Sequence, residues 1–152
     1  MNLNIPYMET DNKLLNDAYR IAAGDIVGNI VYYQNGLLTE EKPCMIAGLD
    51  YNTPWTRDTA INIWNALSIL SPEVSKNTLL AVLEEEEGNI YIGGQYWDSI
   101  IWMIGAREYC RFHKDDNFYR LAFEAGRNSV HRLEEDEFDE EDGLFRGPAV
   151  YG

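Results

Sequence analysis

The sequence predicts an all-α domain in which buried helices alternate with helices that expose one face. Through most of the chain, apolar residues recur at three- and four-residue spacing, which is the period of an α-helix. Two of the expected helices are apolar on nearly every side, whereas two others are amphipathic. No strand pattern in the sequence is of comparable strength, so about five helices account for the expected fold.

The first helix is expected from about Asp11, a good N-cap residue, to Tyr33. Its apolar stripe consists of Leu15, Tyr19, Ala22, Ile26 and Ile30. Gly24 and Gly28 weaken this helix and suit the close approach of another backbone. A loop with mixed turn signals is expected over residues 34–55.

The second helix is expected over residues 57–70, where only a narrow polar stripe interrupts the apolar residues, so it should be buried on most sides. The third has a clear start signal: Ser71 as N-cap, Pro72 in the first helical position and Glu73 in the first turn. It should end in the acidic residues 84–87 and fray there, because like charges at a helix C-terminus oppose the helix dipole.

The fourth helix, over residues 97–113, contains the apolar run IIWMIGA, and the fifth, over residues 115–133, is amphipathic. Buried and one-sided helices therefore alternate, joined by short turns. An inner ring of helices inside an outer ring gives this order, and so does a layered α/α solenoid. The long loops 88–96 and 134–152, rich in glycine and aromatic residues, are where functional residues are expected.

Composition restricts the partners. The chain has 152 residues and is expected to form a single domain, 1–152. Its net charge of −14 argues against binding nucleic acid or an anionic membrane surface, whereas an acidic, aromatic-rich chain suits a neutral ligand such as a sugar. Cys44 and Cys110 are expected to be reduced and packed. Without a signal peptide or an apolar run of ~18 residues, a cytoplasmic protein is expected.

The segment Tyr51-Asn52-Thr53-Pro54-Trp55-Thr56-Arg57-Asp58-Thr59-Ala60 resembles the WTRD-type segment of the six-hairpin glycosidases, a group that includes glucoamylases and glucosidase/mannosidase-like hydrolases. Three later segments are similar to that family in the same order: residues 71–80, 96–102 and 142–147. The resemblance covers about two thirds of the chain, residues 51–147. It implies an (α/α)6 toroid, of which this chain would form the N-terminal hairpins.

The resemblance also implies a function. Members are glycoside hydrolases, and most cleave α-glycosidic bonds with inversion, using one carboxylic acid and one carboxylate. In glucoamylase-like members an Arg-Asp pair recognises the terminal sugar, and it matches Arg57 and Asp58. A guanidinium fork and a carboxylate can hold neighbouring hydroxyl groups by charge-assisted hydrogen bonds. The structural alternative is an ion pair at the helix start, with Asp58 serving the helix N-terminus.

Five further residues complete the candidate substrate-binding set. Trp55, Tyr96 and Trp97 can stack on a pyranose ring, although aromatic residues at helix starts are more often part of a core. Asp98 is either a hydroxyl ligand or a helix N-terminal acid. Arg146, in a glycine-rich loop, is either a pocket residue or a surface arginine. We expect five of these residues to gather at one end of the helices, near the 134–152 loop: Trp55, Arg57, Asp58, Trp97 and Asp98.

Neither a catalytic acid nor a base is assigned, because in this family both carboxylates lie further along the chain than the residues present. Neither a cofactor nor a metal is expected: His113 and His131 share no ligand spacing, and the acidic run 134–142 lacks the spacing of an EF-hand loop. Two alternatives remain, a non-catalytic glycan-binding or assembly module, and a sugar isomerase or epimerase using histidine. Apolar surface left open on the buried helices predicts self-association.

Overall fold

The computed structural model describes residues 5–48, 50–95 and 97–147, which form five helical segments and three short antiparallel strand pairs. The helices are α1 (Lys13–Gly28), α2 (Thr56–Asn62), a π-helical stretch (Ile63–Leu67), α3 (Ser68–Leu70), α4 (Pro72–Ala81), α5 (Asp98–Phe112) and α6 (Asp116–Glu137). The strands are β1 (Ile30–Tyr33), β2 (Lys42–Met45), β3 (Leu83–Glu86), β4 (Asn89–Ile92), β5 (Phe138–Asp139) and β6 (Leu144–Phe145). The chain is therefore mostly helical, but the strict all-α prediction is wrong.

Three helices begin at side chains that accept hydrogen bonds from the first turn. Ser71 accepts from the amide of Val74, which confirms the predicted start of α4. Asn12, and not Asp11, caps α1, while Asp115 caps α6. Such capping is a local property of the sequence, and for this reason the starts were predicted closely.

Two predicted helix ends are strands instead. The first helix stops at Gly28, and β1 pairs with β2 in antiparallel register, with Ile30 opposite Met45. The acidic residues of β3 do not fray from a helix but pair with β4. The turn between them consists of Glu87 and Gly88 with φ angles of 51° and 80°, the left-handed conformations of a two-residue hairpin turn.

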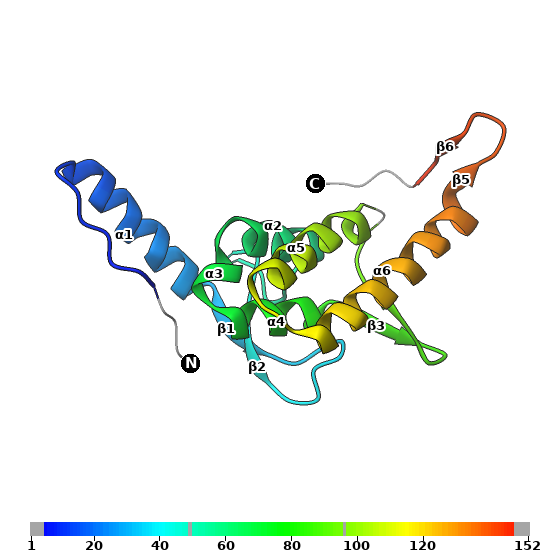
Figure 1. The fold of residues 1–152 in the computed structure, drawn as a ribbon, viewed down its shortest axis with the longest axis horizontal. Helices are drawn as coiled ribbons and strands as arrows, with labels where there is room; N and C mark the ends of the chain where they lie inside the picture. Colours follow the sequence, from blue (N-terminus) through cyan, green and yellow to red (C-terminus); the bar gives the residue numbers. More distant parts are fainter. Residues whose placement is uncertain (1–4, 49, 96, 148–152) are drawn as a thin grey trace.

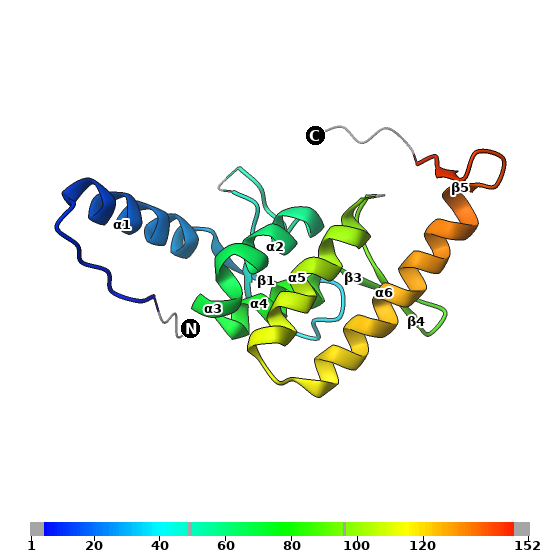
Figure 2. The ribbon, with the colours of Figure 1, turned by 45° about the horizontal axis from the view of Figure 1, so that its top comes forward.

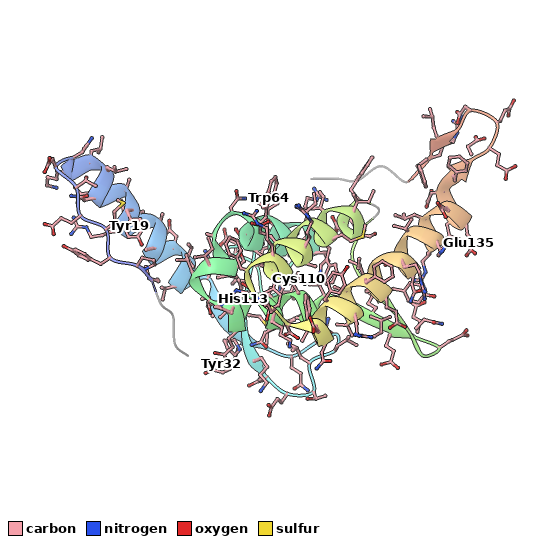
Figure 3. The ribbon with its side chains drawn as sticks, in the orientation of Figure 1. Tyr19, Tyr32, Trp64, Cys110, His113 and Glu135 are labelled. Atoms are coloured by element: carbon pink, nitrogen blue, oxygen red, sulfur yellow. The ribbon has the colours of Figure 1, made fainter. Side chains whose placement is uncertain are left out.

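The second helical segment is continuous from Thr56 to Leu70 and includes the π-helical stretch. Ile63 and Leu67 are fully buried, whereas Trp64 is 49% exposed and Ile69 is 59% exposed. Trp64 lies at the outer edge of the central helices in Figure 3. Most residues of this segment are buried or half-buried, as expected, and the one face without cover within the described residues is the open apolar surface that the sequence also predicts.

The core lies between the second helical segment, α4, α5 and α6, and β2, β3 and β4 each contribute buried residues to it. Gly105 on α5 permits a close approach to α2, since a Cβ atom there would lie 2.8 Å from the Cα atom of Ala60. Trp102 is fully buried, and its indole nitrogen donates to the carbonyl of Leu79 in α4 over 3.3 Å. The helix α1 extends away from one side of these helices, whereas α6 carries the β5–β6 hairpin away from the opposite side (Figures 1 and 2).

Two further properties bear on the expectations from composition. Within the described ranges, no helix combines the length and apolarity that crossing a bilayer requires. Cys44 and Cys110 are free cysteines, and burial raises the pKa of the Cys44 thiol to about 12.

Candidate functional site

Three hydrogen bonds join the N-terminal ends of α2 and α5 and the loop that precedes α5. The Nε atom of Arg57 donates to Oδ1 of Asp98 over 3.1 Å. The other carboxylate oxygen of Asp98 accepts from the amide of Gln95 over 2.8 Å. The hydroxyl of Thr56 donates to the carbonyl of Gly93 over 2.8 Å. Two helices and the loop between β4 and α5 are thereby held in one arrangement.

Asp98 is the centre of this arrangement and is only 4% exposed. A buried carboxylate is costly unless it is paired and hydrogen-bonded, and here both of its oxygens are engaged. Gly94 next to it has a φ of +111°, and a Cβ atom there would lie 2.7 Å from Oδ2 of Asp98. The loop therefore requires glycine at this position, and the geometry favours Asp98 as the residue that orients Arg57.

Arg57 is oriented but not enclosed. Its side chain is 38% exposed, and among the described residues its two terminal nitrogens have no hydrogen-bond partner. Asp58, in the same helical turn, is partly exposed and forms no ion pair with any residue that the structure describes. Arg57 pairs with Asp98 and not with Asp58, so the ion pair at the helix start joins two helices, while Asp58 lies in the first turn of α2 as the structural alternative expects.

A pocket of about 260 Å³ opens beside Asp98. It is lined from several elements, including Trp55 before α2, Glu84 in β3 and Gln95 in the loop before α5. Arg57 and Asp58 are not among its lining residues, so Asp98 borders the pocket while also contacting the guanidinium outside it. A second hollow of about 180 Å³ shares Glu84 and the 93–95 loop and extends to α6.

The aromatic candidate residues do not line the same pocket. Trp55 is 44% exposed and packs edge-to-face against Tyr51, with ring centroids 5.7 Å apart. Trp97 is 53% exposed and lines a different, apolar groove that includes Leu144 and Phe145 of the terminal hairpin. Tyr96 lies outside the described residues. Trp55 and Asp98 thus share the first pocket, whereas Trp97 faces the hairpin.

Arg146 lies in the terminal hairpin and pairs with its acidic residues. It contacts the carboxylate of Asp139 over 2.7 Å and also that of Asp142, and its amide donates to the carbonyl of Glu137. Its side chain is 62% exposed and lines neither of the two polar pockets. These contacts hold the hairpin together.

Glu84 lines both pockets but is not among the residues expected from the sequence, because the acidic residues 84–87 resemble a helix end. The Glu87-Gly88 pair, followed by the strand-like run Asn89–Ile92, is the signal that would have identified a hairpin.

The two histidines lie apart from the candidate site. The ring of His113 is 2.6 Å from the carbonyl of Ser68, near the C-terminal end of α5, and His131 lies 3.3 Å from Glu134 on α6. Across residues 5–48, 50–95 and 97–147, no group of three or more His, Cys, Asp or Glu residues is placed to hold a metal ion.

In comparisons with known proteins, no family model, curated protein or solved structure matches the chain. The glycosidase resemblance therefore rests on the sequence segments themselves.

Proposed function

We propose that this chain is a carbohydrate-processing domain of the glycoside hydrolase type, which hydrolyses α-glycosidic bonds by inversion when the (α/α)6 toroid is complete. The observation that supports the proposal is the Arg57–Asp98 contact. It holds a partly exposed guanidinium at the N-terminal ends of two adjacent helices, in the helical turn that also carries Asp58.

Sugar hydroxyl groups both donate and accept hydrogen bonds in fixed directions. The terminal nitrogens of Arg57 supply donors, and Asp58 supplies acceptors in the same helical turn. A charge-assisted hydrogen bond of this kind contributes about 1.5–3 kcal/mol. Because Asp98 already fixes the guanidinium, less side-chain entropy is lost when a sugar binds.

In this proposal Arg57 and Asp58 recognise the sugar, and Trp55, which lines the 260 Å³ pocket and is 44% exposed, supplies a face on which a pyranose ring can stack. An inverting mechanism also requires a carboxylic acid and a carboxylate far enough apart to admit a water molecule. We assign neither role to a residue of this chain.

The second candidate is a glycan-binding module without catalysis. It is favoured by the same contacts, because Arg57, Asp58 and Trp55 offer hydrogen bonds and stacking but no assigned proton donor. The two candidates differ in turnover and not in the recognition of the sugar.

The test is sugar binding by isothermal titration calorimetry, with glucose, mannose, maltose and α-mannobiose, alongside hydrolysis of aryl α-glucosides and α-mannosides. Arg57→Ala and Asp58→Asn should weaken sugar affinity by roughly one to two decades. The chain alone should show no hydrolysis, because the proton transfers that are missing each contribute about 10²–10⁴ in rate. Binding without hydrolysis by the complete protein would favour the glycan-binding module.

Arg111→Ala is a closely matched control. Arg111 also contacts a buried carboxylate of α5, that of Glu108, over 3.1 Å, but near the other end of the helix. Both arginine substitutions should therefore lower stability to a similar extent, while only Arg57→Ala lowers sugar affinity. Equal sugar affinity in the two folded variants would refute the proposed site.

A further inference from the structure

The helix α1 exposes an apolar stripe that nothing in the described chain covers. The stripe, here the α1 stripe, consists of Leu14, Leu15, Ala18, Ile21 and Ala22, all of them exposed. Leu14 is 77% exposed and Ile21 is 65% exposed. Isolated helices of this length are marginally stable in water, and most helices depend on packing of their apolar face.

The other face of α1 is already occupied. Residues 5–10 run along it, where the hydroxyl of Tyr19 donates to the carbonyl of Pro6 and the side-chain amide of Asn16 donates to the carbonyl of Thr10. Near its C-terminal end, Ile26 packs against the core. The α1 stripe is therefore the face left for a partner.

A groove of matching chemistry lies at the opposite end of the molecule. It has a volume of about 370 Å³ and is lined by Trp97, Ile100, Val130, Leu133, Leu144 and Phe145, here the hairpin groove. Figure 3 shows the separation, with Tyr19 of α1 and Glu135 of α6 near opposite ends of the chain. One end thus offers a convex apolar helix face and the other a concave apolar surface.

The exposed area of the chain is larger than that of a compact monomer of the same mass. The chain exposes 9816 Å², whereas a compact monomer of 17.5 kDa exposes about 7,900 Å², so roughly 1,900 Å² is in excess. A standard interface covers about 800 Å² on each partner. A copy that uses both the α1 stripe and the hairpin groove would cover about twice that, which is close to the excess.

Charge also favours this pairing. The side chains of Lys13 and Arg20, beside Asp17, are 87% and 72% exposed on α1. The acidic residues 134–137 close α6 next to the hairpin groove. Lys13 and Arg20 both pair with Asp17, and with Asp25 the helix α1 carries no net charge, so in a chain of net charge −14 a contact through α1 adds little like-charge repulsion at the acidic end.

We infer that the α1 stripe of one copy docks into the hairpin groove of a second copy of this chain, so that the chain associates head to tail. The contact is a helix-in-groove interface of the heterologous type, in which each copy uses two different surfaces. It is independent of the proposed sugar site.

Sedimentation velocity of the full chain, over a roughly hundredfold range of concentration, tests the inference. The wild type should associate, and Ile21→Glu or Leu144→Glu should each raise the apparent Kd at least about tenfold, because either places a charge in the apolar contact. Ile69→Glu, at a similarly exposed residue on α3, is the matched control and should associate as the wild type does. Circular dichroism and thermal midpoints verify that each variant is folded, and Val130→Arg replaces Leu144→Glu if the latter unfolds.

Mixing the two variants gives the decisive result. Ile21→Glu keeps an intact hairpin groove and Leu144→Glu keeps an intact α1 stripe, so an equimolar mixture should form one-to-one dimers although each alone is monomeric. A mixture that remains monomeric would overturn the head-to-tail contact. So would a wild type that is monomeric at every concentration, or an Ile69→Glu variant that dissociates as fully as Ile21→Glu.

Discussion

Replacement of Asp98 tests whether the buried carboxylate orients Arg57 or only stabilises the fold. Asp98→Ala removes the acceptor of both the Arg57 guanidinium and the Gln95 amide. Breaking a buried ion pair on one side costs about 3–5 kcal/mol, but Arg57 is 38% exposed and water can replace part of the lost contact. We therefore expect a loss of about 2–3 kcal/mol, equivalent to a fall in Tm of roughly 5–10 °C.

Asp98→Asn separates the two roles. It keeps the shape and one acceptor oxygen, so its cost should be smaller, about 1–2 kcal/mol. The guanidinium, however, loses its charged partner. Urea denaturation followed by tryptophan fluorescence gives the free energy of unfolding, and calorimetric titration of the folded protein gives the sugar affinity. Asp98→Asn should weaken the affinity about tenfold in protein that is fully folded.

Glu108→Ala is the control on the same helix, because Glu108 is 6% exposed and contacts Arg111. It should match Asp98→Ala in lost stability and leave sugar affinity unchanged. If Asp98→Asn retains full sugar affinity, or if Glu108→Ala lowers that affinity as much, Asp98 does not position Arg57 and our account of the site is wrong.

Three further predictions concern other parts of the molecule. Gly94→Ala should destabilise the protein by about 2–4 kcal/mol in urea denaturation, because φ is +111° and the added Cβ has no space; Gly88→Ala, with open space around it, should cost only about 1 kcal/mol. The hydrogen bond from Lys76 holds the pKa of Asp115 below its ordinary 3.8, so the stability that ionised Asp115 contributes is present above that pH and is lost as the pH falls below it. The denaturation midpoint of the wild type should therefore fall between neutral and acidic pH. The midpoint of Asp115→Asn, which preserves the helix cap, should fall less over the same range. The buried Cys44 thiol, whose pKa is raised to about 12, should resist thiol reagents in the native protein and react in urea; prompt modification of two thiols without denaturant would contradict this.

Helices whose signals are local were predicted from the sequence. The Ser71-Pro72-Glu73 start and the periodic run of α6 depend on neighbours within one or two turns, and the structure places both close to the expected residues. By contrast, residues 30–33 continue the apolar spacing of α1 and would extend it equally well as helix. Only pairing with residues 42–45 makes them a strand, and that is a tertiary effect.

The candidate site was predictable by residue type but not by partner. The sequence identifies Arg57, Asp58 and Asp98 as candidates, yet periodicity cannot show that Arg57 reaches across to Asp98 on α5. Similarly, Arg146 was a candidate because its loop is rich in glycine, whereas its contacts with Asp139 and Asp142 depend on how that loop closes. Contacts between distant segments require the packed helices that bring them together.

The π-helical stretch Ile63–Leu67 sets the rotational phase between the two halves of the second helical segment. Such a stretch carries one residue more than α-helical winding accommodates, and one residue corresponds to a rotation of roughly 100° about the helix axis. If all the residues of this stretch were wound as regular α-helix, the half that carries Arg57 would turn by roughly 100° relative to the half that carries Leu67, whereas removal of one residue would restore α-helix and keep the two halves in phase. The direction in which Arg57 faces α5 is therefore determined partly by a winding irregularity two turns away.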